Sequence, residues 1–332
     1  MRQKLFQLPK GLLETLLNLA DNLLYETYLV IEEVYQRQSL LSSHYLMEFH
    51  GLFLRKKSQS LKPRKLSKDF TKNMSLLGLD ERPQQVEFAE KVEQLLREQK
   101  TAFIQAQTGL GKTYGYMLPA LSMENEGGIL VSVPTKILQN QIMQEEGSRL
   151  KDTFHIDIHS LKGPQNYLKL DNFYKVLHRP EPNRLFIRFK MQILIWLTET
   201  ETGDLDEIGQ LYRYQHFLAE LVHDGKLSKK SLFISEDFWQ RSQDRAKSSR
   251  LLLTNHAYLV TRLEDNPEFV NNRLVIIDEA QKMLIALENL AQESYLLEAL
   301  VTQVQKSLET EKDLIQRRLL ESIGFECRYL ID

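Results

Sequence analysis

A glycine-rich segment between a short apolar run and a helical pattern constrains this chain more than any other feature. It reads Ala-Gln-Thr-Gly-Leu-Gly-Lys-Thr at Ala106–Thr113, and Ala102–Ile104 precedes it as a predicted strand. Small residues between a strand and a helix allow successive backbone N–H groups to point at one phosphate, and the helix N-terminus adds its positive dipole end. The segment therefore predicts a phosphate-binding loop in a parallel α/β sheet.

Each residue of this loop is a candidate contact for a nucleoside triphosphate. Lys112 would reach the β- and γ-phosphate oxygens, and the hydroxyl of Thr113 would bind Mg²⁺. Ala106 stands where the usual pattern has glycine, and a residue this small is still tolerable there. The predicted nucleotide contacts in the loop are Ala106, Gln107, Thr108, Gly109, Leu110, Gly111, Lys112 and Thr113.

An acidic pair follows a second apolar run, Leu274–Ile277. Asp278 at the carboxyl end of a buried strand is expected to hold Mg²⁺, because ligands of parallel sheets sit at that edge. Glu279 would orient or deprotonate the attacking water. A strand that ends in Asp-Glu is common by itself, so the prediction depends on its pairing with the phosphate-binding loop.

Three weaker signals accompany these motifs. Arg82 and Gln85 are further candidate nucleotide contacts, and the amide of Gln85 suits an adenine edge, although the segment also fits an ordinary surface helix start. Thr135 follows the predicted strand Ile129–Val133, where its hydroxyl would bind a nucleic-acid phosphate or cap a helix. Asn255 and His256 end another predicted strand and are candidate nucleic-acid contacts, or a capping turn with a hydrogen-bonded histidine.

Composition excludes several classes of protein. The 332 residues suggest two domains, and the net charge of −2 leaves room for local basic surfaces only. Cys327 is the one cysteine, so neither a disulfide framework nor a four-cysteine metal site forms within the chain. The sequence shows no signal-peptide pattern and no apolar run long enough to span a membrane, which predicts a cytoplasmic protein without membrane contact.

Strand and helix patterns divide the rest of the chain. Leucines at helical spacing predict a helical hairpin in residues 10–50, and a basic stretch from Arg55 to Lys72 is either a solvated linker or a phosphate-contacting arm. Residues 167–250 lack a strand pattern and are expected to form a mostly helical insertion. Helices are predicted over 84–99, from about 112 and from 136, and strands over 129–133, 154–158, 251–254 and 274–277.

The order of these motifs resembles one family. The motifs are Arg-Pro-Gln-Gln from Arg82, the loop at Ala106–Thr113, Val-Pro-Thr-Lys from Val133, Leu-Lys-Gly-Pro-Gln-Asn-Tyr-Leu from Leu161, Thr-Asn-His from Thr254 and Asp-Glu-Ala-Gln from Asp278. This sequence is similar to the DinG branch of the XPD-like superfamily 2 DNA helicases. It most resembles the bacterial form fused behind a polymerase III epsilon-like 3′–5′ exonuclease, over residues 76–283.

The resemblance implies a domain plan. It predicts a helical connector (1–54), a basic linker (55–75), a RecA-like P-loop domain with a parallel sheet (76–166 and 248–283), a mostly helical insertion in place of an iron–sulfur domain (167–247) and the start of an arch-like helical region (284–332).

The same resemblance implies an activity and its partners. The activity is that of a helicase that couples ATP hydrolysis to the binding and unwinding of single-stranded DNA, in DNA repair or replication. The implied cofactors are ATP and Mg²⁺. The other implied partners are an upstream exonuclease domain and a second RecA-like domain, or a separate chain that supplies it.

Three departures from the family pattern qualify these expectations. Lys169 stands where the first cluster cysteine is usual, so no iron–sulfur cluster is expected. Gln281 replaces the histidine of Asp-Glu-Ala-His, a nucleotide-site residue that couples nucleotide state to the partner domain. Residues 284–332 are too few for a second RecA-like domain with its arginine finger, so this chain is expected to bind ATP but hydrolyse it slowly.

Two other functions fit the same residues. One is an ATP-sensing module that regulates an exonuclease without motor action, and the other is an inactive gene fragment. No exonuclease motif is visible in the sequence, so we expect no DNA degradation by these residues themselves.

Overall fold

The structure is a computed structural model that describes residues 2–21, 23, 25–38, 44–58, 61–123, 127–291, 297–311 and 313–331. It divides into two compact units, residues 1–279 and residues 280–332. The first unit holds the parallel sheet and every predicted site residue except Gln281.

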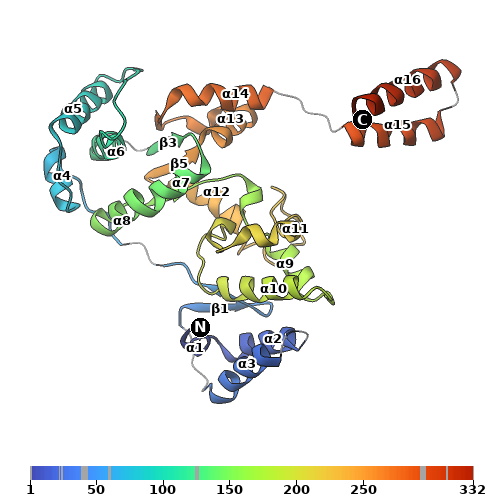
Figure 1. Cartoon of the computed structure of the whole chain (residues 1–332). Helices are drawn as coiled ribbons and strands as arrows, with labels where there is room; N and C mark the ends of the chain where they lie inside the picture. Colours follow the sequence, from blue (N-terminus) through green and yellow to red (C-terminus); the bar gives the residue numbers. More distant parts are fainter. Residues whose placement is uncertain are drawn as a thin grey trace. The chain divides into compact units, whose positions relative to one another are not determined.

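The first unit begins with helices, continues through a sheet with covering helices, and contains the insertion (Figure 1). Its N-terminal elements are α1 (Arg2–Leu5), α2 (Lys10–Ala20), α3 (Tyr25–Arg37), β1 (Leu46–Phe49) and β2 (Leu52–Arg55). The sheet and its helices comprise α4 (Phe70–Leu76), α5 (Pro83–Arg97), α6 (Lys112–Ser122), β3 (Ile129–Val133), α7 (Lys136–Ile142), the π-helix η1 (Met143–Gly147), α8 (Ser148–Phe154), β4 (Ile158–Ser160), β5 (Leu251–Asn255), α13 (His256–Asp265) and β6 (Leu274–Ile277). The insertion contributes α9 (Leu170–Leu177), α10 (Arg184–Trp196), α11 (Gln215–Leu218) and α12 (Phe238–Ser248). Short 3₁₀ turns are η2 (Pro164–Asn166), η3 (Leu205–Glu207), η4 (Leu211–Tyr214) and η5 (Pro267–Val270).

The sheet is parallel and four-stranded, in the order β4-β5-β3-β6. In its register Ser132 lies opposite both Thr254 and Ile277. The carboxyl ends of β3, β5 and β6 therefore meet at one edge, as in an α/β domain of the predicted RecA-like class. That edge carries the residues that follow each strand, which are the predicted functional ones.

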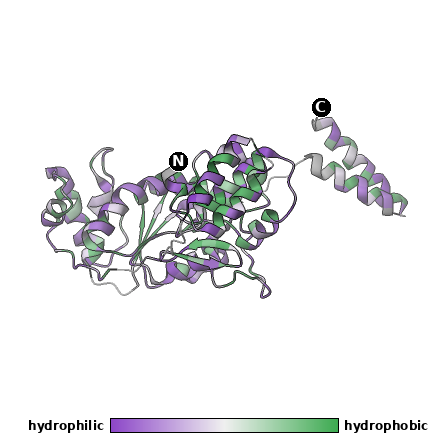
Figure 2. Ribbon diagram, turned by 90° about the horizontal axis from the view of Figure 1, so that it is seen from below, coloured by the Kyte–Doolittle hydropathy of each residue, from purple (hydrophilic) through white to green (hydrophobic). Residues whose placement is uncertain are grey.

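Burial explains why these runs form strands and why these helices cover them. Every residue of β3 and β5 is buried, as expected for central parallel strands covered on both faces. The apolar sides of α4, α5 and α6 pack with β3, β5 and α8 in one core, in which Met117, Leu118 and Ala120 are fully buried. Figure 2 shows the strands as hydrophobic and the surrounding helices as mixed along their length.

The prediction of a strand at Ala102–Ile104 is wrong. These residues have no regular structure, and the side chains of Phe103 and Ile104 are 92% and 41% exposed. A strand needs a neighbour for its backbone N–H and C=O groups, and within the described residues β6 lies at the end of the sheet with no strand beyond it. Residues two apart in a strand face the same side of the sheet, so the 37% exposure of both Val275 and Ile277 marks one face of β6 that is partly open to solvent.

Two other predictions differ in detail. Residues 154–158 bury alternate side chains as a strand would, yet α8 ends at Phe154, His155 is left-handed at φ 54°, and β4 begins only at Ile158. The predicted linker 55–75 contains most of α4, whose Phe70 and Met74 lie in the core. The apolar residues on one side of α4 pack in the core, so α4 belongs to the domain and not to a linker.

The N-terminal segment combines the expected helices with an unpredicted hairpin. Leu12, Leu13 and Leu16 are buried on one side of α2, which packs with α3. β1 and β2 then pair antiparallel around His50 and Gly51, both at positive φ, as tight hairpin turns require.

The second unit, residues 280–332, is helical. It contains η6 (Ala280–Lys282), α14 (Met283–Ala291), α15 (Leu297–Thr310) and α16 (Leu314–Ile331). The last two pack as a pair, with Val304 and Cys327 buried. Among the described residues, no helix of either unit is long and apolar enough to cross a membrane.

Candidate nucleotide-binding site

The loop before α6 has the backbone that its glycines predict. Gly109 and Gly111 lie at φ 81° and φ 84°, in the left-handed region that favours glycine. A Cβ at Gly111 would stand 2.3 Å from Nε2 of Gln85, so a side chain there would displace the Gln85 amide. The loop therefore turns sharply into the first turn of α6, where Lys112 and Thr113 lie.

Two residues at the start of α5 hold the loop by its carbonyl groups. Nη1 of Arg82 donates to the carbonyl of Gly109 at 2.8 Å, and Nε2 of Gln85 donates to that of Gly111 at 2.9 Å. The C=O and N–H of one planar trans peptide point in opposite directions. Fixing these carbonyls toward α5 therefore turns the N–H groups of Leu110 and Lys112 the other way.

That arrangement suits an anion. The N–H groups of Leu110 and Lys112 face away from α5, and they adjoin the positive end of the α6 dipole. Lys112 makes no ion pair with any residue that the structure describes, and its contact with phosphate stays a prediction. Gln85 is only 4% exposed, and both Gln85 and Arg82 already donate to the loop, so their contacts with the nucleotide stay predictions.

The acidic pair lies at the end of β6 beside α6. The backbone N–H of Asp278 donates to the carbonyl of Ser132 at 2.9 Å, which continues the β3–β6 ladder. Oδ2 of Asp278 accepts a hydrogen bond from the hydroxyl of Tyr116 at 3.3 Å. Tyr116 lies three residues after Thr113, on the same side of α6. The structure thus brings both predicted Mg²⁺ ligands to one buried tyrosine.

Tyr116 contacts the candidate residue Asp278, a contact that the sequence motifs did not reveal. Burial raises its pKa well above the ordinary value, the carboxylate of Asp278 adds to that, and Thr113 opposes it. The hydroxyl therefore keeps its proton at neutral pH and acts as a donor. Helical spacing is the signal that would have found it, because residues i and i+3 face the same way and Thr113 was already a candidate.

Glu279 stands in a strained conformation. Its φ is 49°, in the left-handed region that costs a residue with a side chain about 1–2 kcal/mol. Backbone strain of this kind persists only where the surrounding structure imposes it. The buried ring of His256 is close by, and its Nδ1 lies 2.7 Å from the hydroxyl of Ser132. Burial lowers the pKa of His256, while Asp278 and Glu279 oppose that change.

The predicted nucleic-acid contacts fall into two groups. Thr135 is exposed at the carboxyl end of β3, and its hydroxyl accepts from the N–H of Leu138 as the cap of α7. Asn255 and His256 are 6% and 0% exposed, and Asn255 donates to Gln139 at 2.9 Å. Direct contact with nucleic acid stays a prediction for all three, and for the last two it competes with these internal partners.

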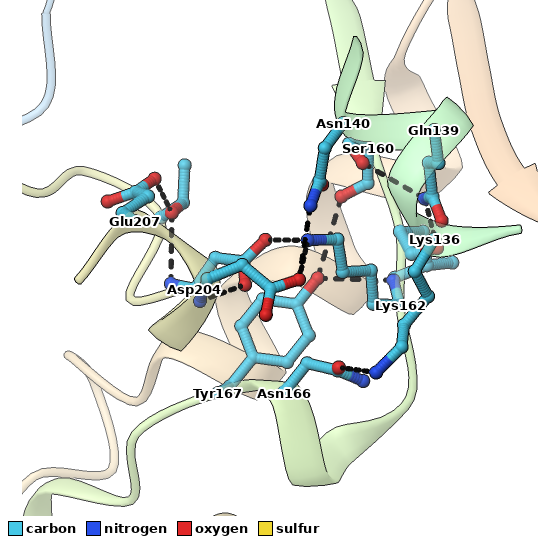
Figure 3. Close-up of polar contacts among 12 residues, drawn as sticks. Lys136, Gln139, Asn140, Ser160, Lys162, Asn166, Tyr167, Asp204 and Glu207 are labelled. Carbon is cyan, nitrogen blue, oxygen red and sulfur yellow. Dashed lines mark hydrogen bonds and ion pairs between the residues drawn. The ribbon is translucent and has the colours of Figure 1, made fainter. Parts of the chain in front are cut away.

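A polar network joins this edge to the insertion (Figure 3). Nζ of Lys162 is buried and lies 2.5 Å from Asp204 and 2.8 Å from Asp206, both of which belong to the insertion. Asn140 on α7 also donates to Asp206 at 3.2 Å. Burial raises the pKa of Asp204 even though Lys162 opposes it. None of these residues was a candidate from sequence.

Lys136 extends the network to the surface. Its Nζ donates to Oδ1 of Asn166 at 3.0 Å, beside exposed Thr135. Elsewhere in the insertion Lys169, at the position of the expected cysteine, donates to Asp224 at 2.6 Å. That hydrogen bond is the largest of the contributions that lower the pKa of Asp224 to about 2.

Gln281 lies in η6 of the second unit and is exposed. Its role at the nucleotide site stays a prediction.

Comparison with known proteins identifies relatives over most of the chain. Residues 82–196, which include the loop, match the family model described as DEAD/DEAH box helicase. The chain is 29% identical over 297 residues to a protein named 3'-5' exonuclease DinG from Staphylococcus saprophyticus subsp. saprophyticus. It is 27% identical over 293 residues to proteins of the same name from Staphylococcus aureus strains RF122 and USA300.

The matched lengths are unequal. These alignments cover 85% of this chain and 32% of each relative. The chain therefore spans about a third of the length of the curated relatives it matches.

Proposed function

We propose that this chain, a relative of the DinG proteins with a DEAD/DEAH box helicase domain, binds Mg-ATP at the loop Ala106–Thr113 and couples it to single-stranded DNA. One observation carries the proposal. Arg82 and Gln85 donate to the loop carbonyls, and Tyr116, one turn after Thr113 on α6, donates to Asp278, so the loop lies close to both oxygen ligands.

The residues present fit a magnesium nucleotide. A hydroxyl and a carboxylate are ligands that Mg²⁺ accepts, together with phosphate oxygens and water. When bound, the ion would neutralise charge that develops on the phosphates. Lys112 would bind the β- and γ-phosphates, and Glu279 would orient the attacking water and accept its proton.

Single-stranded DNA would lie along the carboxyl edge of the sheet. Thr135 and Lys136 are exposed there, and a hydroxyl and an amine are common donors to phosphate oxygens. Lys136 already donates to Asn166, the residue directly before the insertion. Family resemblance supports the coupling of ATP hydrolysis to DNA unwinding in a longer protein, and this coupling belongs to our proposal.

The first test is equilibrium binding of a fluorescent ATP analogue in the presence of Mg²⁺. We expect the unmodified chain to bind, and Lys112→Ala to bind at least about ten times more weakly, because the variant loses the cation for the β- and γ-phosphates. Lys91→Ala is the matched control, since Lys91 is an exposed lysine on α5 whose amine contacts Gln94. Equal binding by the unmodified chain and Lys112→Ala, with Lys91→Ala unchanged, would mean that the loop does not bind the nucleotide.

DNA binding is tested separately by the anisotropy of labelled single-stranded DNA. Lys136→Ala should weaken binding and reduce its salt dependence, as the loss of one phosphate contact requires. Lys91→Ala again serves as the control and should bind DNA as the unmodified chain does. The same salt dependence for all three proteins would remove Lys136 from the proposed DNA path.

A further inference from the structure

Tyr116 joins the two halves of the candidate site through a single hydroxyl group. The residue lies on α6 and is 5% exposed. Its O–H is 3.3 Å from Oδ2 of Asp278, a residue 162 positions later in the sequence. Thr113 also interacts with this hydroxyl, from the preceding turn of the same helix. The tyrosine thus contacts Asp278 and lies one helical turn after Thr113, the other residue predicted to bind Mg²⁺.

The ring and the hydroxyl have different roles. The ring belongs to the hydrophobic core with Met117 and Leu121, and a phenylalanine ring would fill the same space. The hydroxyl is buried, and a buried hydroxyl needs a partner. It finds that partner in the carboxylate of Asp278, so the hydrogen bond is the specific contribution of tyrosine at this position.

Tyr114 provides an internal comparison. It is on the same helix two residues earlier, is partly buried and packs against the same core. The charges that act on its hydroxyl are those of Glu146, Arg149 and Glu145, on the segment that follows α7. Two tyrosines on one helix therefore differ in whether the hydroxyl reaches the acidic pair.

We propose that Tyr116 is a positioning residue for Mg²⁺: its O–H donates to Oδ2 of Asp278 and fixes the carboxylate in the orientation that binds the ion. This inference rests on the proposed function, because it names a supporting residue of the same site. A carboxylate accepts several hydrogen bonds, so the bond from Tyr116 leaves lone pairs for the metal. Removing a group that orients a metal ligand usually costs about 10–100-fold in metal affinity.

The metal and the nucleotide respond differently to the loss of this hydroxyl. Removing it frees the carboxylate to rotate and leaves Lys112 and the loop N–H groups unchanged. The nucleotide should therefore bind as before when no metal is present. Only the part of its affinity that depends on Mg²⁺ should fall.

The experiment titrates Mg²⁺ into the full chain with a fluorescent ATP analogue, and repeats the binding in excess EDTA. For Tyr116→Phe we expect the Mg²⁺ concentration at half-maximal effect to rise about tenfold, with binding in EDTA unchanged. Tyr114→Phe is the matched control and should titrate like the unmodified chain. Thermal unfolding of each variant shows whether the fold is kept.

Three results would overturn the inference. These are an unchanged Mg²⁺ titration for Tyr116→Phe, an equal loss of affinity with and without Mg²⁺, or the same shift for Tyr114→Phe. If Tyr116→Phe does not fold, Tyr116→Met, which also fills apolar space without a hydroxyl, replaces it with the same expected rise. The Lys112→Ala experiment is done before the tyrosine variants are compared. Failure of Lys112→Ala to weaken binding would contradict the proposed function and not this inference alone.

Discussion

At the scale of single residues, the packing of Gly111 against Gln85 shows how closely the loop is fitted. The amide of Gln85 occupies the space in which any side chain at position 111 would lie, and the same amide holds the loop carbonyl. Gly109 has a similar φ, yet a Cβ there would meet no atom within 4 Å. Backbone conformation therefore constrains both glycines, and close packing constrains only Gly111.

Alanine variants of the two glycines should therefore differ in nucleotide affinity. Gly109→Ala adds the strain of a left-handed alanine, about 1 kcal/mol, and should weaken nucleotide binding several-fold. Gly111→Ala adds the same strain and also displaces Gln85, so its loss of affinity should be larger, roughly tenfold or more. Binding of the ATP analogue to both variants measures this, and equal losses would show that Gln85 does not support the loop.

His159 on β4 predicts a dependence of stability on pH. Burial, and after it the charge of Arg245, lowers the pKa of His159 to about 4, and Nε2 lies 2.9 Å from the hydroxyl of Ser242. A histidine whose pKa is lower in the folded state binds fewer protons there than in the unfolded state. Its stabilising effect is therefore complete above its ordinary pKa of about 6.5 and is lost as the pH falls toward 4.

Chemical denaturation at several pH values tests this expectation. The free energy of unfolding should decrease as the pH falls from 6.5 to 4. His159 gains its proton near pH 6.5 in the unfolded state and only near pH 4 in the folded state. In His159→Gln, which has no titrating ring, the decrease over this interval should be smaller. Identical pH profiles for the two proteins would mean that His159 does not titrate differently in the folded state.

At the scale of elements, one buried lysine beside the sheet forms ion pairs with the insertion. Lys162 follows β4, and its partners Asp204 and Asp206 lie at the start of η3 in the insertion. The attraction between buried charges must offset the cost of removing each charge from water. Lys162 together with its two aspartates therefore contributes little net stability. Loss of the lysine is costly, because Asp204 remains largely buried without a counter-charge.

We therefore expect Lys162→Met to destabilise the first unit by roughly 3 kcal/mol, the low end of the range for a buried pair, because Asp206 is partly exposed. Chemical denaturation measures this change. Adding Asp204→Asn and Asp206→Asn to that variant should recover much of the loss, since the unpaired charges are then removed. Lys247→Met is the control, because its ion pair with Asp244 is exposed and should change stability by less than about 1 kcal/mol. A small effect of Lys162→Met would show that water reaches both aspartates.

Local pattern was enough to predict some elements and not others. β3, β5 and β6 are short apolar runs whose neighbours also lie in the chain, and the glycines before Lys112 require a tight turn whatever surrounds them. Ala102–Ile104 has the same apolar pattern as those strands but no partner strand among the described residues, so the prediction failed. The roles of Lys162 and Tyr116 depend on residues distant in sequence, which no single motif reveals.

At the scale of the whole molecule, the openness of the loop bears on activity. Gln107, Thr108, Gly109 and Gly111 are exposed, and Arg82 already donates to a loop carbonyl. Electrostatic stabilisation of a phosphoryl transition state is strongest where water is excluded and fixed donors surround the developing charge. We therefore expect the exposed loop to bind Mg-ATP without hydrolysing it fast.

Phosphate release from Mg-ATP measures this directly, with and without single-stranded DNA. We expect release by this chain to stay near the background given by Lys112→Ala, because Gln107, Thr108, Gly109 and Gly111 are exposed to water. Release that DNA stimulates and Lys112→Ala abolishes would contradict this expectation. It would mean that a complete hydrolytic site forms from these residues, and self-association would be the next property to measure.

Within the part of the chain that the structure describes, β6 has a strand on one side only, which has a practical consequence for such measurements. A strand at the end of a sheet presents backbone N–H and C=O groups that another extended segment can pair with, and apolar side chains flank it here at Val275 and Ile277. Phe103 and Ile104 add an exposed apolar stretch in the same unit. The concentration of the protein is thus itself an experimental variable, and affinities determined from dilute and concentrated samples will agree only while that edge stays unpaired.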